Sequence, residues 1–586
     1  MSLQFIFGNS GSGKSHYLYQ QIVEESIRHP EKNYLVLVPE QFTMQTQKDL
    51  CMAHPRGGIM NIDVLSFGRL AHRVFEETGK ERQPILDDEG KNLVLRKIAG
   101  NYEDELTVLK GDLKKQGYIS EVKSVISEFT QYGIDFEQLD SFMEGLNPES
   151  YLYYKLKDIR KVYEGFEDYL RDKYITKEEL LDVLSQTVPE AKMLKDSVIA
   201  MDGFTGFTPV QNRLIGELLK VCDKIMLTVE IDRREDPFVY KHPYQLFALS
   251  KQMVTSLTEV AQEVRVEIDE PVWLCKNPSY RFKENPEMAF LEEELFRYSR
   301  RKYSGEKMRS ISLHEVHTPQ EEAQYVAEEI RRLVREEGYR YREIAVIASD
   351  LSTYADALEK ACDRYEIPVF MDHKKSILLN SFVEYLRSLL VMVEQNYTYE
   401  SVFRYLRTSL CGFTRDEVDR LENYCLALDL KGFKKWDQVW VRKTPMTTKE
   451  ELEELNHLRM RFVEKLTPLH TVLKKRKKTV KEITLAVYEY LVQEKIQEQL
   501  AELEQKFQED GELALAKEYA QIYRIVLELF DKFVELLGEE EIPLKEYCEL
   551  LDAGLEEAKV GVIPPSLDQV VIGDMERTRL KDIRAL

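Results

Sequence analysis

The chain has 586 residues, of which 43% are hydrophobic and 10% aromatic, so we expect several packed domains rather than global disorder. A net charge of −22 argues against a protein that coats nucleic acid non-specifically, although it leaves room for a local basic channel. We find no apolar run of about 18 residues and no signal segment, so we expect no membrane partner. The 7 cysteines are scattered without a C-x-x-C pair, which is typical of buried thiols in a reducing cytoplasm.

The first predicted element is the strand Gln4–Phe7, which runs directly into Gly8-Asn9-Ser10-Gly11-Ser12-Gly13-Lys14-Ser15. This octapeptide fits G-x-x-x-x-G-K-[ST], the phosphate-binding loop of P-loop NTPases, and a helical pattern follows it. Glycines let the backbone N–H groups surround a polyphosphate, and the helix directs its positive end at the anion. We predict that all eight residues bind ATP, that Lys14 reaches the β- and γ-phosphates, and that Ser15 ligates Mg²⁺.

The next elements predict an α/β domain that is interrupted by helices. Apolar, β-branched runs at 34–39 and 62–67 are typical of buried parallel strands. From 84 to 190 the pattern is charged and helical, and strand character returns at 198–202 and 224–229. We therefore predict a first domain of residues 1–83 plus 191–300, with residues 84–190 as a helical insertion.

A second α/β section is expected to start near 311–316 and to continue through a helix at 320–337 and a strand at 344–348. Residues 376–557 are nearly all helical in pattern, and a last strand covers 569–573. The predicted second domain is thus 301–375 plus 558–586, with the insertion 376–557. The densest basic run, 474–478, favours a solvated helix face or loop, and the alternative is a contact with nucleic acid or a partner.

Five segments carry a resemblance to a known family: Val38-Pro39-Glu40-Gln41-Phe42-Thr43, Leu65-Ser66-Phe67-Gly68-Arg69-Leu70-Ala71, Asp202-Gly203-Phe204-Thr205-Gly206-Phe207-Thr208-Pro209, Leu421-Glu422-Asn423-Tyr424-Cys425 and Gly573-Asp574-Met575-Glu576-Arg577-Thr578-Arg579. The sequence resembles UvrD-like superfamily 1 helicases, and more closely AddB (RexB), the B subunits of bacterial AddAB helicase–nucleases. The resemblance extends over essentially the whole chain. It implies an α/β fold with two RecA-like P-loop domains, the second incomplete, each interrupted by a mostly helical insertion.

The helicase motifs show informative gaps. In the D-E-x-Q-D segment of an active motor, Asp202 matches the Mg²⁺-associated aspartate, but Gly203 replaces the glutamate that activates water. Ser349 replaces the arginine that contacts the γ-phosphate, and residues 230–234 lack the Gly and Gln of motif III. The resemblance therefore implies Mg²⁺ binding by Ser15 and Asp202, weak or no ATP hydrolysis, and no assignable catalytic residue.

The resemblance also implies partners: an AddA-type motor subunit, double-stranded DNA, and a single strand on which the Chi hotspot is read during recombinational repair. Superfamily 1 helicases line the single-strand path with segments that here contain Gln41, Phe42, Thr43, Ser66, Phe67 and Arg69. Arg577 and Arg579 lie where motif V approaches the nucleotide and the DNA, and an ordinary surface position is an equally good interpretation.

Full-length members of the family continue into a nuclease domain with Mg²⁺-binding carboxylates and an iron–sulfur cluster held by four cysteines. We can assign neither pattern here, so we expect the chain to be a fragment without nuclease activity. Two alternatives stay open. One is an active superfamily 1 translocase with an unconventional base, and the other is a structural subunit whose P-loop is vestigial.

Overall fold

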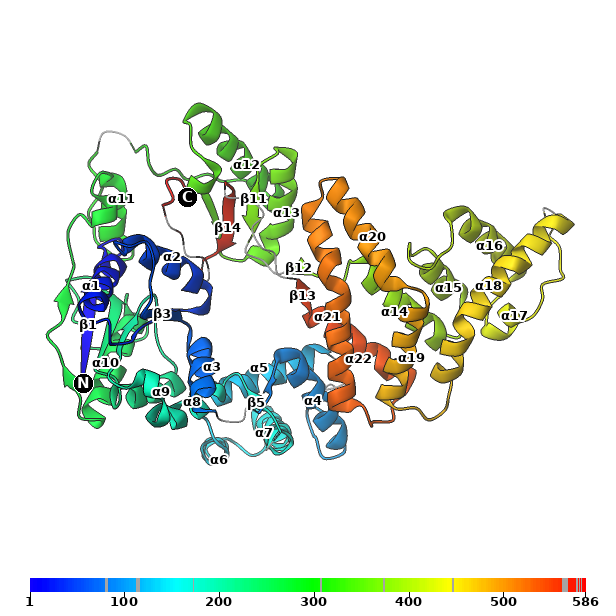
Figure 1. Ribbon diagram of the computed structural model, residues 1–586, viewed down its shortest axis with the longest axis horizontal. Helices are drawn as coiled ribbons and strands as arrows, with labels where there is room; N and C mark the ends of the chain where they lie inside the picture. Colours follow the sequence, from blue (N-terminus) through cyan, green and yellow to red (C-terminus); the bar gives the residue numbers. More distant parts are fainter. Residues whose placement is uncertain are drawn as a thin grey trace. The chain divides into compact units, whose positions relative to one another are not determined.

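The computed structural model describes residues 1–79, 83–111, 116–171, 173–305, 308–371, 375–444, 447–560, 568–575, 578, 580 and 582–586. The chain divides into two compact units. Figure 1 shows the chain coloured along the sequence, from blue at the N-terminus to red at the C-terminus. Unit 1 comprises residues 1–87, 106–109 and 121–316. Unit 2 comprises residues 88–105, 110–120 and 317–586.

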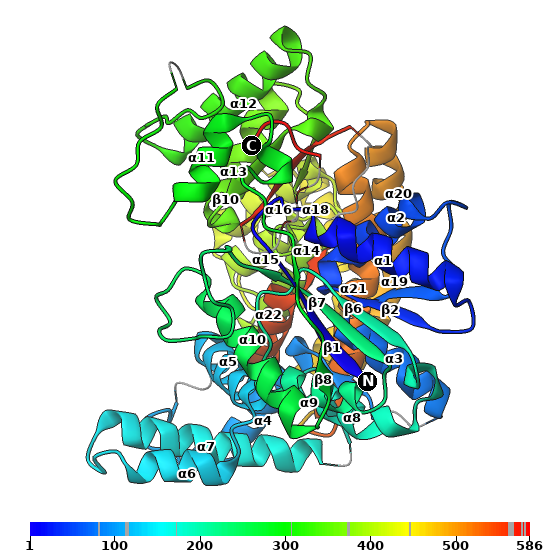
Figure 2. The same cartoon turned by 90° about the vertical axis from the view of Figure 1, so that its left-hand side faces the viewer.

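Unit 1 is built on a parallel sheet with the strand order β3-β2-β6-β7-β1-β8, and β9 also pairs with β1. Its strands are β1 Ser2–Gly8, β2 Tyr34–Leu37, β3 Ile62–Leu65, β6 Val198–Met201, β7 Lys224–Glu230, β8 Glu267–Ile268 and β9 Val272–Trp273. In the register of the central pair, Ser2 lies opposite Lys224 and Gly8 opposite Glu230. Because these strands are parallel (Figure 2), the loops that follow them meet at one edge of the sheet.

Helices cover both faces of this sheet, which explains why its strands are continuous apolar runs. One face packs on α1 and α2, and the other packs on α3, α8, α9 and α10. The helices of the unit 1 region are α1 Lys14–Arg28, α2 Thr43–Ala53, α3 Phe67–Thr78, α5 Gln116–Tyr132, α6 Phe136–Glu144, α7 Tyr151–Leu170, α8 Leu180–Thr187, α9 Pro209–Leu219, α10 Ala248–Glu263 and α11 Pro286–Glu294. The short strands β4 Ile85–Leu86 and β5 Ile175–Thr176 pair with each other. The mixed α/β class and the parallel strands predicted from the sequence are confirmed.

Unit 2 contains a small parallel sheet, β10-β14-β11, formed by Ala345–Ala348, Val570–Asp574 and Val369–Met371. Two helices, α12 (Pro319–Glu336) and α13 (Leu351–Arg364), pack on it. The rest of the unit is mainly helical: α14 Ser381–Glu394, α15 Tyr399–Leu406, α16 Arg415–Leu428, α17 Phe433–Asp437, α18 Lys449–Leu473, α19 Val480–Gln493, α20 Ile496–Glu509, α21 Leu513–Leu537 and α22 Leu544–Glu557. The strands β12 Lys375–Ser376 and β13 Lys559–Val560 form a separate antiparallel pair.

Two sequence expectations differ from the structure. Residues 311–316, where we expected the second α/β section to start, form no strand, and Leu313 is 97% exposed. A segment becomes a strand only where a neighbouring strand pairs with its backbone groups, and this segment has no such neighbour among the described residues. The helix α4 (Asp88–Asn101), which we included in the 84–190 insertion, groups with unit 2, where Lys97 Nζ lies 2.8 Å from Glu540 Oε1.

None of the described helices is both long and apolar enough to cross a bilayer.

Glu167, a half-buried residue of α7, is expected to make the stability of unit 1 dependent on pH. Burial, helped by the nearby Glu179, raises the pKa of Glu167 from 4.5 to about 7. Because the folded chain binds this proton more tightly, its stabilisation is complete below about pH 4.5 and is lost as the pH rises through about 7. We expect Glu167→Gln to raise the free energy of unfolding by about 1–3 kcal/mol at pH 8 and to change it little at pH 4. Urea unfolding at both pH values measures this. The exposed Glu164→Gln is the control, and an equal effect of Glu167→Gln at both pH values would contradict the prediction.

Candidate nucleotide site

The P-loop connects the end of β1 to the start of α1 at the carboxyl edge of the unit 1 sheet. Gly11 and Gly13 adopt positive φ angles of 70° and 93°, a region in which residues with a Cβ are strained. Gly13 is also the N-cap of α1, so the N-terminus of this 15-residue helix opens onto the loop. The backbone that the motif predicts is therefore present, with its glycines at positions that require them.

Lys14 is held inside the loop. Its Nζ donates a hydrogen bond to the carbonyl oxygen of Asn9 at 3.0 Å, and its side chain is partly buried. Burial lowers the pKa of Lys14, while the nearby carboxylates of Glu230 and Asp202 act in the opposite direction. An anionic ligand in the loop would supply the negative charge that this ammonium group lacks in the described structure.

Asp202 directly follows β6 and lies at the centre of a cluster of hydroxyl groups. Its side chain is buried, with 2% relative exposure. Its Oδ1 accepts hydrogen bonds from Ser15 Oγ at 3.0 Å and Thr228 Oγ1 at 2.6 Å, and its Oδ2 accepts one from Tyr19 at 2.7 Å. The two residues that the sequence assigns to Mg²⁺, Ser15 and Asp202, are thus brought together from positions 187 residues apart.

The donor set fits a magnesium–nucleotide complex. Hydroxyl and carboxylate oxygens are the ligands that Mg²⁺ prefers, and Ser15 and Asp202 present both kinds next to the loop. The hydroxyl of Ser12 is buried and has no hydrogen-bond partner among the described protein groups. A phosphate oxygen in the loop would accept such a hydrogen bond. Ser12 thus adds an unpaired donor to the cationic Lys14 and the backbone of the loop.

The residue after Asp202, where an active motor is expected to carry glutamate, is a glycine with a left-handed backbone. Gly203 has φ of 78°, in the left-handed region. A residue with a Cβ is disfavoured there by about 1–2 kcal/mol. The structure therefore shows no carboxylate beside Asp202 at this position and a backbone conformation that suits glycine.

A segment that sequence reasoning missed lies against the loop. We call residues 279–294 the cover segment; it contains a short 3-10 turn, Tyr280–Phe282, and the helix α11. The backbone N–H of Arg281 donates to the carbonyl oxygen of Gly11 at 3.1 Å. The Nδ2 of Asn9 lies 3.1 and 3.2 Å from the two carboxylate oxygens of Glu292. The P-loop motif describes only the loop itself, so it carries no signal for residues that reach it from about 270 positions away.

The first group of predicted DNA-binding residues follows β2, at the same edge of the sheet as the P-loop. Gln41 is exposed and Phe42 is half-buried, both in the 3-10 turn Glu40–Phe42. Thr43 begins α2, is buried, and donates its hydroxyl proton to the carbonyl oxygen of Glu40 at 3.0 Å. Of these side chains, Gln41 is the one most open to a ligand.

The second group lies at the start of α3, after β3. Ser66 is the N-cap of this helix, and its Oγ accepts a hydrogen bond from the backbone N–H of Arg69. Phe67 is buried against Phe204 and Phe207, with ring centroids 5.5 and 6.3 Å away. Ser66 and Phe67 therefore shape the helix start, and Arg69 presents an exposed cation there.

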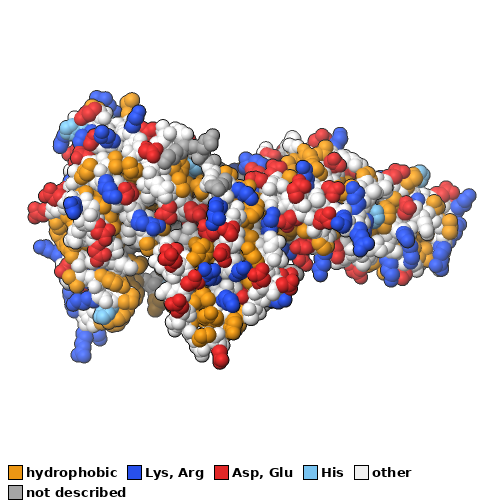
Figure 3. Space-filling view, turned by 90° about the horizontal axis from the view of Figure 1, so that it is seen from below, with side chains coloured by type: hydrophobic (Ala, Val, Ile, Leu, Met, Phe, Trp, Pro, Cys, Tyr) orange, Lys and Arg blue, Asp and Glu red, His pale blue; other side chains and the backbone are white. Residues whose placement is uncertain are grey.

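Other basic residues offer less support for a DNA contact. Arg577 and Arg579 lie outside the described residues. In the run 474–478, Lys475 and Lys477 lie 3.9 and 3.3 Å from glutamates, and Lys478 is buried. On the face shown in Figure 3, basic and acidic side chains are interspersed. The ion pairs of Lys475 and Lys477 favour the interpretation of this run as a solvated helix face or loop, from which the buried Lys478 departs.

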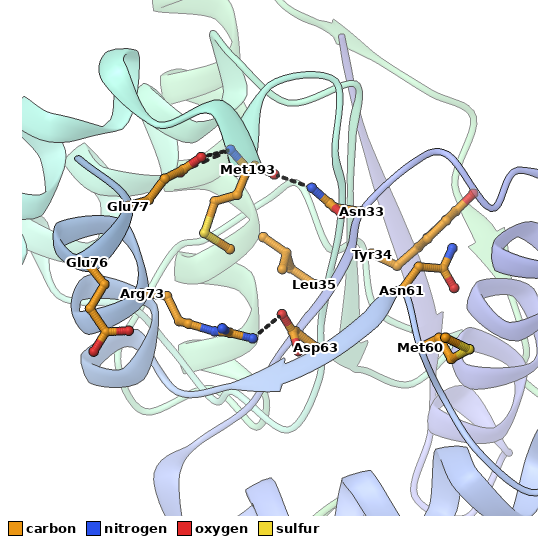
Figure 4. Close-up of a pocket in the computed structure, with 10 residues that line it drawn as sticks. All are labelled: Asn33, Tyr34, Leu35, Met60, Asn61, Asp63, Arg73, Glu76, Glu77 and Met193. Atoms are coloured by element: carbon orange, nitrogen blue, oxygen red, sulfur yellow. Dashed lines mark hydrogen bonds and ion pairs between the residues drawn. The ribbon is translucent and has the colours of Figure 1, made fainter. Parts of the chain in front are cut away.

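The hollow drawn in Figure 4 does not belong to the nucleotide site. It has a volume of about 410 Å³ and is lined by Asn33, Tyr34, Leu35, Met60, Asn61, Asp63, Arg73, Glu76, Glu77 and Met193. Residues Asn33 and Asn61 precede β2 and β3, so the hollow lies at the amino edge of the sheet, opposite the P-loop. Its only described cation, Arg73, is paired with Asp63 at 2.9 Å, and its other charged groups are acidic, which does not suit a phosphate.

Comparisons with known proteins support the resemblance seen in the sequence. A family model described as "ADDB, N-terminal" matches residues 5–292, and one described as "UvrD-like helicase C-terminal domain" matches residues 282–560. A protein of Lachnoclostridium phytofermentans is 43% identical over 100% of this chain and 51% of its own length. Proteins of Clostridium novyi and Acetivibrio thermocellus are each 33% identical over 100% of this chain and 51% and 52% of their own lengths.

All three relatives are named as the B subunit of an ATP-dependent helicase/deoxyribonuclease. This chain spans about half the length of these curated relatives. The predicted resemblance to AddB is confirmed: the N-terminal half of the chain matches the AddB N-terminal model, the following part matches the UvrD-like helicase model, and relatives named as B subunits align with the whole chain.

Proposed function

We propose that this chain is a nucleotide-binding, helicase-like but motor-deficient part of a helicase–nuclease B subunit. It guides and scans single-stranded DNA, reading the Chi sequence, while double-strand breaks are processed for recombinational repair. In this proposal the two parallel sheets belong to RecA-like domains, each interrupted by a helical insertion. The observation that carries it is the hydrogen bond between Ser15 and Asp202. It lies next to Gly203, at the position where a motor needs a glutamate.

The missing base weakens hydrolysis more than binding. Binding of Mg²⁺ and phosphate rests on the loop backbone, Lys14, Ser15 and Asp202, which are all in place. Proton abstraction from the attacking water needs a positioned carboxylate, and such assistance contributes about 10²–10⁴-fold to rate. The chain therefore retains the groups that hold a nucleotide and lacks the group that activates water.

The second helicase-like region supports the same conclusion. After β10, a motor carries an arginine for the γ-phosphate, and here Ser349 and Asp350 follow the strand. Asp350 is the N-cap of α13, accepting hydrogen bonds from the backbone N–H and the hydroxyl of Ser352 at 3.0 and 2.5 Å. These positions start a helix and offer no cation to a phosphate.

The partners and location of the chain follow from the proposed role. The relatives are named as B subunits, so we propose an AddA-type motor subunit as the partner, with single- and double-stranded DNA as substrates in the cytoplasm. ATP and Mg²⁺ are the proposed ligands of this chain. We assign the deoxyribonuclease activity and the iron–sulfur cluster of the family to residues outside these 586, because the cysteines here are scattered.

An ATPase assay tests the proposed loss of motor activity. With Mg·ATP and single-stranded DNA in excess, we expect turnover far below about 1 s⁻¹, because the water-activating group is absent. Turnover of about 1 s⁻¹ or faster that Lys14→Ala abolishes would contradict the proposal and support an active translocase. If nucleotide does not bind at about millimolar concentration, the P-loop is vestigial and the proposed nucleotide site fails.

The backbone at Gly203 makes a separate, measurable prediction. We expect Gly203→Ala to lower the free energy of unfolding by about 1 kcal/mol or more, because alanine is strained at a positive φ. Gly206→Ala is the matched control, since Gly206 is outside the positive-φ glycines and a Cβ there would meet no atom within 4 Å. Urea unfolding compares the two variants, and equal effects would show that the conformation at Gly203 is not constrained.

A pair of arginines on α3 tests the proposed single-strand path. Arg69 is exposed in the first turn of α3, whereas Arg73, one turn later, is paired with Asp63 at 2.9 Å. We expect Arg69→Ala to weaken binding of single-stranded DNA about 3- to 10-fold and to reduce the salt slope by about 0.7. Arg73→Ala should change neither quantity. Fluorescence anisotropy at several salt concentrations measures both, and identical behaviour of the two variants would remove Arg69 from the path.

A further inference from the structure

The backbone of the cover segment lies directly against the P-loop. Besides the hydrogen bond from the Arg281 backbone to Gly11, the Cβ of Arg281 lies 2.6 Å from the point where a Cβ on Gly11 would stand. The Cδ of the same side chain is 3.5 Å from that point. Gly11 is therefore needed for close approach as well as for its positive φ, and the Arg281 side chain starts directly over the loop.

Arg281 is a cation for which the described residues supply no carboxylate partner. Its side chain is exposed, and no ion pair involves it within the part of the chain that the structure describes. Its backbone N–H is hydrogen-bonded to Gly11, so the side chain starts beside the loop that also holds Lys14. Two cations thus face the same loop, an arrangement that an anion between them would stabilise.

Two hydroxyl groups add to this arrangement. Ser279, in the cover segment, has 1% relative exposure, and its Oγ lies 3.2 Å from the Cβ position of Gly11. Neither this hydroxyl nor that of Ser12 in the loop has a hydrogen-bond partner among the described protein groups. Buried hydroxyl groups rarely lack a partner, so an unpaired one from each side of the loop indicates a ligand that accepts hydrogen bonds.

We propose that the cover segment is the second half of the phosphate site, in which the Arg281 guanidinium and the Ser279 hydroxyl contact the polyphosphate held by the P-loop. The inference deepens the proposed function and rests on nucleotide binding at this loop. Arginine suits the role because its planar fork of donors matches phosphate oxygens and keeps its charge at any physiological pH. Because Ser349 stands where a motor carries the γ-phosphate arginine after β10, Arg281 of unit 1 would supply that cation instead.

The carboxylate of Glu292 lies on the opposite side of the charge balance, because it would repel a bound polyphosphate. It accepts hydrogen bonds from Asn9 within the loop, and burial raises the pKa of Glu292. An ionised carboxylate beside a polyphosphate is repelled by it. The cover segment therefore carries two charges of opposite effect on nucleotide affinity, an attractive one at Arg281 and a repulsive one at Glu292.

Isothermal titration of the 586-residue chain with Mg·ATP tests the inference through variants of opposite sign. Arg281→Ala should weaken binding about 10- to 100-fold, the effect of losing a hydrogen bond to a charged group. Glu292→Gln, which keeps the shape and an acceptor for Asn9, should strengthen binding about 3-fold or more. Lys283→Ala is the matched control, because Lys283 is exposed next to the same turn, and its affinity should equal that of the wild type.

The outcomes separate this inference from the proposed function. If the wild type binds Mg·ATP and Arg281→Ala binds it equally well, the inference is wrong while the nucleotide site stands. If the wild type does not bind, both fail. If Lys283→Ala weakens binding as much as Arg281→Ala, the effect is one of general charge and the specific contact is wrong. Thermal unfolding without nucleotide shows whether each variant is folded, and the exposed positions of Arg281 and Lys283 predict unchanged midpoints.

Discussion

The buried carboxylate of Asp202 is the constraint on which the nucleotide site depends. A charge with 2% relative exposure is costly unless donors surround it, and here hydroxyl groups of Ser15, Tyr19 and Thr228 do so. Two of these donors come from α1 and one from β7. The same hydrogen bonds that stabilise the carboxylate therefore hold the P-loop helix against the middle of the sheet and fix where Ser15 lies relative to Asp202.

This constraint explains why the proposed phosphate site would persist if motor chemistry is lost, as we propose. The hydrogen bonds of Asp202 stabilise the fold independently of any ligand, so replacing the residue would remove these bonds from the hydroxyl groups of Tyr19 and Thr228 in the core. Nothing comparable requires a glutamate at the next position, where Gly203 adopts a positive φ. In the proposed function, phosphate and Mg²⁺ binding depends on Asp202, which also stabilises the sheet. Activation of water would depend on the next position, 203, whose side chain has no such role in the fold.

How much the sequence predicts depends on whether a pattern is local. The strand, loop and helix around Gly8–Ser15 were predicted because their glycines, lysine and apolar period are contiguous. The expected start of the second α/β section at 311–316 was wrong because a segment joins a sheet only where a neighbouring strand can pair with it, and sequence does not show this. The cover segment was missed because the contacts of Arg281 and Glu292 with the loop span about 270 residues and follow no motif. The left-handed backbone of Gly203 was likewise invisible, since glycine is compatible with any φ.

The central claim is that the site binds an intact nucleotide between the P-loop and the cover segment. A crystal structure of the chain grown with Mg²⁺ and a non-hydrolysable ATP analogue tests this most directly. We expect the analogue in the loop, with Mg²⁺ beside Ser15 and Asp202 and the phosphates in contact with Lys14 and Arg281. A loop without nucleotide at saturating analogue would contradict the site itself, and phosphates out of hydrogen-bond reach of Arg281 would contradict the role of the cover segment.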